Sequence, residues 1–323
     1  MKCVACSTND LNLKYESVID EFFGASGKYD FWECAACHTL QLDASNGAFP
    51  EERYPPAYSY RKIRDKNKSD YRSKIKDTLL LSLSQGDKKR GTLERVVNYL
   101  ISKIRKLIAG ARTLGVGKPT AIRKKLLDVG CGDGAYLEEM RLLGWEVQGV
   151  ETSRTAVEIC LEKNLPVNFG RIEDLGLKPE SYDVITVRHV IEHIENPLEF
   201  LCNISGLISK HGRILITTPN ATSANSVKYK QDWLGLDVSR HENIFSLYGI
   251  KKLIEQTDLE IEVIKASHRI SRFVNYAGIM RINGRNPYIN SDFAVKIESY
   301  IRSIYNRIRN ADGDEIFLIL KRK

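Results

Sequence analysis

The alternation of strand-like and helix-like segments from Lys124 to His268 constrains the fold of this chain more than any other feature. Short apolar runs of the kind that form buried strands are separated by segments whose apolar residues follow helical spacing. Strands and helices that alternate in this way are typical of a parallel sheet with helices on both faces. The expected strands are 125–129, 146–151, 167–169, 182–187, 212–218, 259–264 and 316–320, and the expected helices include 135–143, 154–163, 197–208 and 247–256. The pattern predicts an α/β fold with a seven-stranded, mostly parallel, doubly wound sheet.

A glycine-rich loop, 130–134, follows the first expected strand and reads Gly-Cys-Gly-Asp-Gly. Glycines at alternate positions let the backbone adopt positive φ and approach a ligand closely. The helix that follows presents free N–H groups to an anionic group. Glu151 ends the second expected strand, where a carboxylate can accept hydrogen bonds from both hydroxyls of a ribose.

Three details distinguish this loop from one that binds a nicotinamide dinucleotide. The glycine spacing is Gly-x-Gly-x-Gly and not Gly-x-Gly-x-x-Gly. Asp128 precedes the loop, where a carboxylate would repel a pyrophosphate but attract the cationic amino group of a methionine tail. Glu173 and Asp174 follow the third strand, in a position to meet an adenine amino group. Hydride transfer is therefore disfavoured.

The loop, Glu151, the pair Glu173-Asp174 and the strand Tyr182-Asp183-Val184-Ile185 together resemble the successive motifs of class I S-adenosylmethionine-dependent methyltransferases. The resemblance is close over 124–220 and extends loosely to the C-terminus. It implies an open seven-stranded sheet with an antiparallel last strand. It also implies S-adenosylmethionine as the cofactor, surrounded by Asp128, Gly130, Cys131, Gly132, Gly134, Glu151, Thr152, Glu173, Asp174 and Arg188.

Two histidines follow the fourth expected strand. The pattern His189-x-x-Glu192-His193-x-x-x-Pro197 is similar to the small-molecule O-methyltransferases of quinone biosynthesis. Methylation of a hydroxyl needs a proton acceptor, and His189 and His193 are candidates for that base. Alternatively, His193 is a structural residue that closes the loop over the cofactor. Some relatives bind Mg²⁺ through Glu-x-x-Glu-His, of which only Glu192 and His193 match here, so the resemblance permits a Mg²⁺ site.

A second cluster, 233–246, contains Arg240, His241 and Ser246. It resembles the Arg-His…Phe-Ser segment of methyltransferases from bacterial surface-polysaccharide gene sets, which implies a sugar or glycan acceptor held by Arg240 and His241, with His241 as a further catalytic candidate. In the alternative, Ser246 caps the helix 247–256 and the other two side chains are exposed.

The seven cysteines include two tight pairs, Cys3-x-x-Cys6 and Cys34-x-x-Cys37. Four thiolates in two such pairs predict a structural, tetrahedral Zn²⁺ site in a small N-terminal ribbon, residues 1–45. Cys131, Cys160 and Cys202 are expected to be small buried residues. The odd count argues against a secreted disulfide scaffold. Such ribbons resemble modules of both sugar and ribosomal RNA methyltransferases, so the ribbon does not identify the acceptor.

The net charge of +8 is concentrated in one segment, since 61–125 holds 20 Lys/Arg against five Asp/Glu. We expect 46–122 to form a basic, helical connecting segment. It could pack on the catalytic core, lie on a membrane surface, or bind nucleic acid. No apolar run approaches the length that spans a bilayer, and the first residues lack the apolar stretch of a secretory signal, which predicts a cytoplasmic protein or one peripheral to the inner membrane face.

Three parts are therefore expected: the ribbon 1–45, the connecting segment 46–122, and a methyltransferase domain 123–323 with a helical insertion at 269–312 that serves as a lid or a homodimer contact. The leading hypothesis is O-methylation of a sugar, glycan or small polar metabolite. The alternatives are an RNA methyltransferase, acting on rRNA or tRNA through the ribbon and the basic segment, and a non-catalytic binding or scaffold protein on the same fold.

Overall fold

The structure, a computed structural model, describes residues 1–20, 25–43, 114, 116, 119, 124–287, 290, 292–309 and 312–323. The predicted connecting segment 46–122 thus lies almost entirely outside the described residues. The chain forms two compact units, of which one comprises 1–59 and 172–323 and the other 60–171. No helix of the described part is both long and apolar enough to cross a lipid bilayer.

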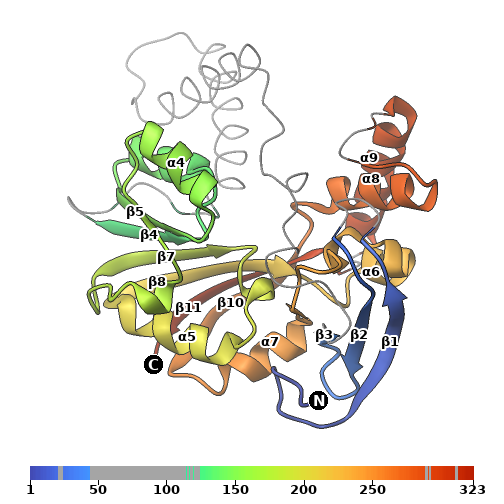
Figure 1. The fold of residues 1–323 in the computed structure, drawn as a ribbon, viewed down its shortest axis with the longest axis horizontal. Helices are drawn as coiled ribbons and strands as arrows, with labels where there is room; N and C mark the ends of the chain where they lie inside the picture. The colour runs from blue at the N-terminus through green and yellow to red at the C-terminus, as the bar shows by residue number, and fades with distance from the viewer. Residues whose placement is uncertain are drawn as a thin grey trace, which may run out of the picture. The chain divides into compact units, whose positions relative to one another are not determined.

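The unit 60–171 carries the first half of the α/β pattern (Figure 1). Its elements are β4 (Lys125–Val129), α3 (Ala135–Leu142), β5 (Glu146–Glu151), α4 (Arg154–Glu162) and β6 (Val167–Phe169). The three strands pair in parallel. Helix α3 turns Leu137 and Met140 inward, and both side chains are fully buried, as is Leu127 of β4. Leu126, Leu127 and Val129 of β4 are all buried, so both faces of the strand are covered, which explains why these positions are apolar.

The other unit carries the second half of the pattern. Its strands and longer helices are β7 (Tyr182–Arg188), α5 (Pro197–Leu207), β8 (Ile208–Pro219), α6 (Ala224–Tyr229), α7 (Leu247–Ile254), β10 (Leu259–Ser267), α8 (Ser271–Ile282), α9 (Phe293–Ile308) and β11 (Glu315–Arg322). Strand β7 pairs in parallel with β8, whereas β11 runs antiparallel to both β8 and β10. Two short 3₁₀ helices, η3 (Ile172–Asp174) and η4 (Ile191–His193), flank β7.

Seven of the described strands form one mixed sheet in the order β10-β11-β8-β7-β4-β5-β6. The antiparallel last strand and the helices that alternate with the parallel strands confirm the predicted fold class. Most predicted boundaries agree with the structure within a residue or two. Strand β8 is longer than expected because it begins at Ile208, directly after α5.

A second sheet contains the N-terminal strands β1 (Leu11–Val18), β2 (Tyr29–Cys34) and β3 (Leu40–Asp43), followed by β9 (Asn243–Ile244). Leu40 pairs with Ile244, so a strand of the catalytic part completes the sheet of the ribbon. The same residues share one apolar core: Tyr29 and Phe31 of β2 pack with Trp233 and its neighbours. Residues 1–43 are therefore an integral part of the unit that includes 172–323.

Candidate functional site

The loop between β4 and α3 has the backbone that the glycines predict. Gly130, Gly132 and Gly134 have φ of 68°, 56° and 74°, values that other residues rarely adopt. A Cβ added at Gly134 would lie 2.4 Å from Leu165 Cδ1, whereas one at Gly132 would meet no atom within 4 Å. The loop is thus packed tightly at its end and has open space beside its middle, as a ligand-binding loop requires.

Glu151 lies at the end of β5 and contacts this loop. One carboxylate oxygen accepts a hydrogen bond from the Gly132 N–H at 2.8 Å, and the other accepts from the N–H groups of Thr152 and Ser153, both at 2.9 Å. A carboxylate offers about four acceptor positions, of which three are used here. Glu151 therefore holds the loop in place and retains capacity for a ligand hydroxyl.

The underside of the loop is closely supported. Asp128 is fully buried, and Cys131 is 4% exposed. Burial raises the pKa of the Cys131 thiol, so this side chain is a neutral packing group. The Gly132 carbonyl accepts a hydrogen bond from the Cys160 thiol at 3.2 Å, and the Asp133 carbonyl accepts from Lys163 Nζ at 2.6 Å. Cys131 and Cys160 are buried as predicted, but Cys202 is exposed, which corrects its assignment as a buried residue.

The remaining residues expected near the cofactor belong to the other compact unit. Glu173 and Asp174 lie on η3 and are exposed, and Arg188 is the last residue of β7 and half-buried. Each therefore occupies the strand end or loop that the sequence indicated. Their part in binding a cofactor stays a prediction.

His189 is fixed between two carboxylates. Its Nδ1 lies 3.1 Å from Glu192 Oε1 and its Nε2 lies 2.9 Å from Glu315 Oε1, and Arg269 pairs with both carboxylate oxygens of Glu315. Burial disfavours the imidazolium, but the hydrogen bonds to Glu192 and Glu315 outweigh it and raise the pKa of His189 to about 9. His189 is thus a cation at neutral pH with both nitrogens donating, which argues against its predicted role as a base.

His193 and His241 form a separate pair. Their ring centroids are 4.8 Å apart, at an interplanar angle of 67°. The Nδ1 of His193 lies 3.0 Å from the Arg240 carbonyl oxygen, and the Nδ1 of His241 lies 2.8 Å from that of Gly235. A carbonyl oxygen can only accept, so each Nδ1 donates, and in the neutral form of either ring the lone pair lies on Nε2. Burial lowers the pKa of His241 to about 4, which keeps that ring neutral.

Glu192, which is fully buried, lies beside this pair, and ligand atoms of Glu192, His193 and His241 lie within 4.8 Å of one another. Mg²⁺ prefers oxygen ligands, whereas this group offers two imidazole nitrogens. The two carboxylate oxygens of Glu192 are already bonded to His189 and to the Thr218 hydroxyl. These donors do not fit Mg²⁺, and the Mg²⁺ site that the resemblance permitted gains no support.

Arg240 is held by two carboxylates. Its guanidinium is fully buried and pairs with Asp237 Oδ1 at 2.6 Å and with Asp20 Oδ2 at 2.7 Å. Ser246 caps α7, accepting from the Gly249 N–H at 2.8 Å, as the alternative for this segment predicted. The same alternative was wrong about exposure, because Arg240 is 2% exposed and His241 is 7% exposed. Arg240 joins the ribbon to the catalytic part.

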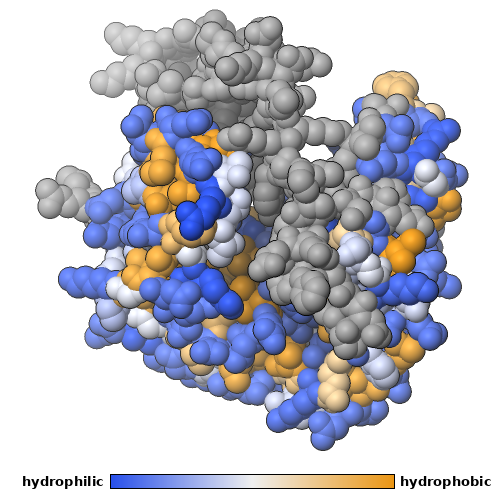
Figure 2. All heavy atoms as spheres, in the orientation of Figure 1, coloured by the Kyte–Doolittle hydropathy of each residue, from blue (hydrophilic) through white to orange (hydrophobic). Residues whose placement is uncertain are grey.

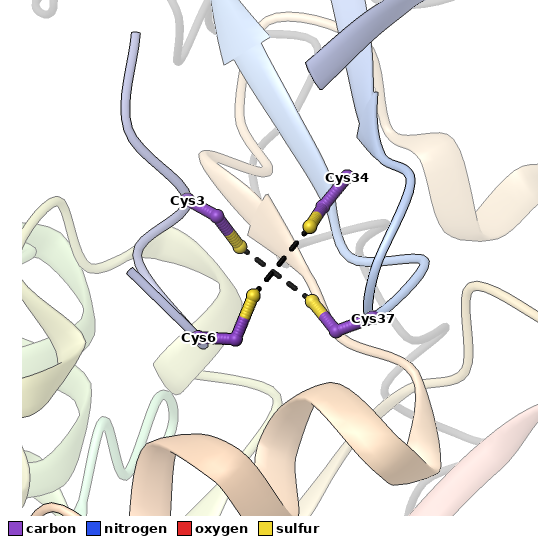
Figure 3. Close-up of side chains that lie close together, drawn as sticks. All are labelled: Cys3, Cys6, Cys34 and Cys37. Carbon is purple, nitrogen blue, oxygen red and sulfur yellow. Dashed lines mark hydrogen bonds between the residues drawn. The ribbon is translucent and has the colours of Figure 1, made fainter. Parts of the chain in front are cut away.

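The four paired cysteines converge on one point (Figure 3). The Sγ atoms of Cys3 and Cys37 are 3.5 Å apart, as are those of Cys6 and Cys34, and all four lie within 4.8 Å of one another. Zn–S bonds of about 2.3 Å in a tetrahedron put the sulfurs about 3.8 Å apart. The four thiolates therefore fit a closed, structural Zn²⁺ site with no open ligand position.

Sequence reasoning missed several residues of this region. Glu315 and Arg269 complete the environment of His189, and Thr218 binds Glu192. Asp20 completes that of Arg240. Glu315 lies 126 residues from His189 and Asp20 lies 220 residues from Arg240. No local pattern connects residues so distant along the chain, and only the sheet order brings them together.

Comparison with known proteins places the chain among methyltransferases. Residues 87–263, more than half of the chain, match the family described as "Methyltransferase domain". The ubiquinone biosynthesis O-methyltransferase of Rickettsia bellii is 28% identical over 191 residues, which cover 54% of this chain and 75% of the relative. The mitochondrial ubiquinone biosynthesis O-methyltransferase of Schizosaccharomyces pombe is 35% identical over 107 residues, which cover 31% of this chain and 39% of the relative.

Among solved structures, phosphoethanolamine N-methyltransferase 2 of Haemonchus contortus in complex with S-adenosyl-L-methionine superimposes with a TM-score of 0.44 at 16% identity. The superposition covers 64% of this chain and 50% of that one. The family match over residues 87–263, together with the glycine loop and the strand order of the sheet, identifies the activity class. The chain belongs to the class I S-adenosylmethionine-dependent methyltransferases.

Proposed function

We propose that this methyltransferase transfers a methyl group to a hydroxyl oxygen of a small molecule, with His193 as the proton acceptor. The observation that carries the proposal is the His193–His241 pair, in which both Nδ1 atoms are held by backbone carbonyls. The two relatives named above are both O-methyltransferases. A hydroxyl acceptor must lose a proton during transfer, and a neutral imidazole with a fixed tautomer is suited to take it.

Residues of the glycine loop are suited to hold the cofactor. The open space beside Gly132 leaves room for the methionine portion, with Gly130 in the same loop. Buried Asp128 supplies negative charge near the amino group of that portion, and Glu151 has one acceptor position left for a ribose hydroxyl. When bound, S-adenosylmethionine supplies an electrophilic methyl group. In this proposal Thr152, Glu173, Asp174 and Arg188 complete the cofactor site, as the family resemblance implies.

His193 is preferred as the base over the other two histidines. His189 has no free lone pair while it donates to Glu192 and Glu315. His241 is 7% exposed and supports His193 from the side. His193 is only half-buried, so an acceptor can reach it. As the hydroxyl oxygen bonds to the methyl carbon, the bond from that carbon to the cofactor sulfur breaks and S-adenosylhomocysteine is the leaving group. The hydroxyl proton passes to His193 Nε2, and the charge that forms on the ring is stabilised by Glu192.

The acceptor belongs to one of two classes of hydroxyl. The resemblance of 233–246 to polysaccharide-associated enzymes supports a sugar, whereas the named relatives act in ubiquinone biosynthesis. A phenolic hydroxyl has a pKa of about 10 and is deprotonated by imidazole more readily than a sugar hydroxyl. RNA methylation and membrane contact through 61–125 rest on residues that are mostly outside the described part, so they stay predictions.

The first test is calorimetric titration of the purified protein with S-adenosylhomocysteine and, separately, with NADH. We expect micromolar binding of the first compound alone, weakened by Asp128→Ala and by Glu151→Ala. Binding of NADH instead would contradict the cofactor assignment.

The second test is transfer of an isotopically labelled methyl group to a panel of phenols and sugars. His193→Gln is expected to reduce kcat by about 100-fold or more while leaving S-adenosylhomocysteine binding unchanged. The matched control is His211→Gln, since His211 is an exposed histidine of β8. Equal activity of the two variants would exclude His193 as the base, and transfer to RNA but to no small molecule would contradict the acceptor class.

A further inference from the structure

The face of helix α9 that packs against the rest of the protein is polar. Ser299 is 1% exposed, and Ser303 Oγ lies 3.3 Å from Asn275 Nδ2 of the neighbouring helix α8. One turn further on, Asn306 Nδ2 lies 3.5 Å from Asn225 Oδ1 of α6. These residues recur every three or four positions and therefore lie on one face of the helix. A surface helix of a globular protein normally buries its apolar face instead.

The opposite face of α9 is apolar and exposed. Phe293 is 77% exposed, Ile301 59% and Ile308 74%. The apolar stripe is completed by further side chains at helical spacing that are all at least 43% exposed: Ile297, Ile304 and Tyr305. Phe273 and Ile282 of α8 are exposed as well. In the view of Figure 2, the region that α8 and α9 occupy in Figure 1 shows separate hydrophobic patches among hydrophilic residues. An exposed apolar surface of this kind usually marks a site where a protein binds a partner or a membrane.

The charges around this stripe favour a negatively charged partner. Residues 269–309 contain eight Arg/Lys and two Asp/Glu. Of the basic residues, Arg269, Arg285 and Arg302 pair with carboxylates and Arg281 is buried, whereas Arg272, Lys296, Arg307 and Arg309 are exposed. Since successive helical residues are rotated by about 100°, Lys296 and Arg307 lie along one edge of the stripe and Arg309 lies along the other. Tyr305 accepts a hydrogen bond from Arg309 at 2.7 Å, which places an aromatic ring beside a cation at the border of the stripe. Basic edges beside an apolar face with aromatic residues are typical of helices that lie in a membrane interface.

We propose that the exposed apolar face of α9, with its basic edges, is a docking surface for an anionic lipid bilayer. The helix lies in the plane of the headgroups with Phe293, Ile301 and Ile308 inserted, while Ser299 and Ser303 keep it attached to the protein. A second copy of the chain fits less well, because two surfaces with the same excess of positive charge would repel each other. This inference does not depend on the reaction proposed above.

The test is flotation of the full-length protein with vesicles of phosphatidylcholine mixed with phosphatidylglycerol, and with vesicles of phosphatidylcholine alone. Neither cofactor nor acceptor is needed. The wild type is expected to bind the mixed vesicles and to bind the neutral ones about tenfold more weakly, with binding that falls as salt is added. A variant with Ile301→Asp and Ile308→Asp is expected to lose about tenfold or more in binding to the mixed vesicles.

The matched control carries Leu142→Asp and Leu161→Asp, which change the charge equally at helix positions that are 54% and 57% exposed. It should bind as the wild type does, and circular dichroism should show that all three proteins are folded. Unchanged binding of the α9 variant, equal loss in the control, or no binding by the wild type would each overturn the proposal. The proposal would also be overturned if sedimentation showed that the wild type is a dimer and that the α9 substitutions dissociate this dimer without changing vesicle binding.

Discussion

At the scale of single residues, the site depends on buried charges that are matched by partners from distant parts of the chain. Arg240 is neutralised by Asp237, three residues away, and by Asp20, from the N-terminal part. The Arg240 backbone carbonyl accepts the hydrogen bond that fixes the His193 tautomer. Asp20 therefore acts on the proposed base only through Arg240, as a positioning residue.

Asp20→Asn is expected to lower the free energy of unfolding by about 3 kcal/mol, because it leaves part of a buried guanidinium charge unpaired. The measurement is urea unfolding. The control is Glu262→Gln, which breaks the exposed pair with Arg213 and should cost less than about 1 kcal/mol. If Asp20 also positions His193, the variant loses kcat with little change in KM. Equal stability losses in the two variants would contradict the assignment of a buried pair.

His189 gives a prediction about pH. Its pKa in the folded protein, about 9, exceeds the ordinary value of 6.5. The stabilisation from its ion pairs is thus fully present below pH 6.5 and is lost as pH rises to about 9. Glu192 behaves in the opposite sense. Although burial disfavours its charged form, the contact with His189 lowers its pKa to about 2, so its contribution is lost only as pH falls from 4.5 toward 2.

Glu315→Gln removes one of the two carboxylates at His189 and should flatten the loss of stability between pH 6.5 and 9. Urea midpoints across this range measure the effect. Glu180→Gln, at a carboxylate that is 62% exposed, should leave the pH profile as in the wild type. Parallel profiles for all three proteins would show that His189 is not held as a cation by Glu315.

At the scale of helices and strands, the sequence predicted the elements whose formation depends on residues close together in the chain. Strands β4, β5 and β6 match the expected ranges because each is a short segment with apolar residues between helical segments and turns, which is visible in the sequence. Strand β9 has two residues, too few to show a period of two, and it exists because β3 pairs with it. The burial of Arg240 was likewise hidden, since a charged residue near a helix start is usually exposed.

The loop from β4 to α3 provides a test of whether the backbone conformation at one position requires glycine. In Gly134→Ala, a residue with a Cβ must adopt the positive φ of this position. Its Cβ would lie 2.4 Å from Leu165 Cδ1. We expect a loss of about 2 kcal/mol or more in the free energy of unfolding, together with weaker S-adenosylhomocysteine binding. Gly206→Ala in α5 is the control, because its Cβ meets nothing within 4 Å and the substitution should stabilise the helix by up to about 1 kcal/mol. Similar effects of the two substitutions would contradict the strain argument.

At the scale of the whole molecule, the sequence suggested separate parts, whereas the structure shows one core shared by residues 1–43 and 172–323. Phe31 and Leu40 pack in the same apolar cluster as Trp233 and Val274. Polar contacts join the same parts: Ser246 Oγ donates to the Cys37 carbonyl at 2.5 Å, and Gln256 Nε2 donates to the Ala5 carbonyl at 2.8 Å. The cysteine cluster is thus attached directly to the helix α7 and to the segment that carries His241.

This continuity predicts that metal release and unfolding of this unit coincide. If Cys3, Cys6, Cys34 and Cys37 bind Zn²⁺, the ion should be released at the same urea concentration at which far-ultraviolet circular dichroism is lost, because no boundary separates the cluster from the core. A chromogenic chelator added to each sample measures the release. Cys6→Ser should lower both midpoints together, whereas Cys202→Ser, at an exposed cysteine, should change neither. Release of Zn²⁺ well before the loss of helical signal would mean that the ribbon opens independently, and the shared core would then contribute little to holding His193 and His241 in place.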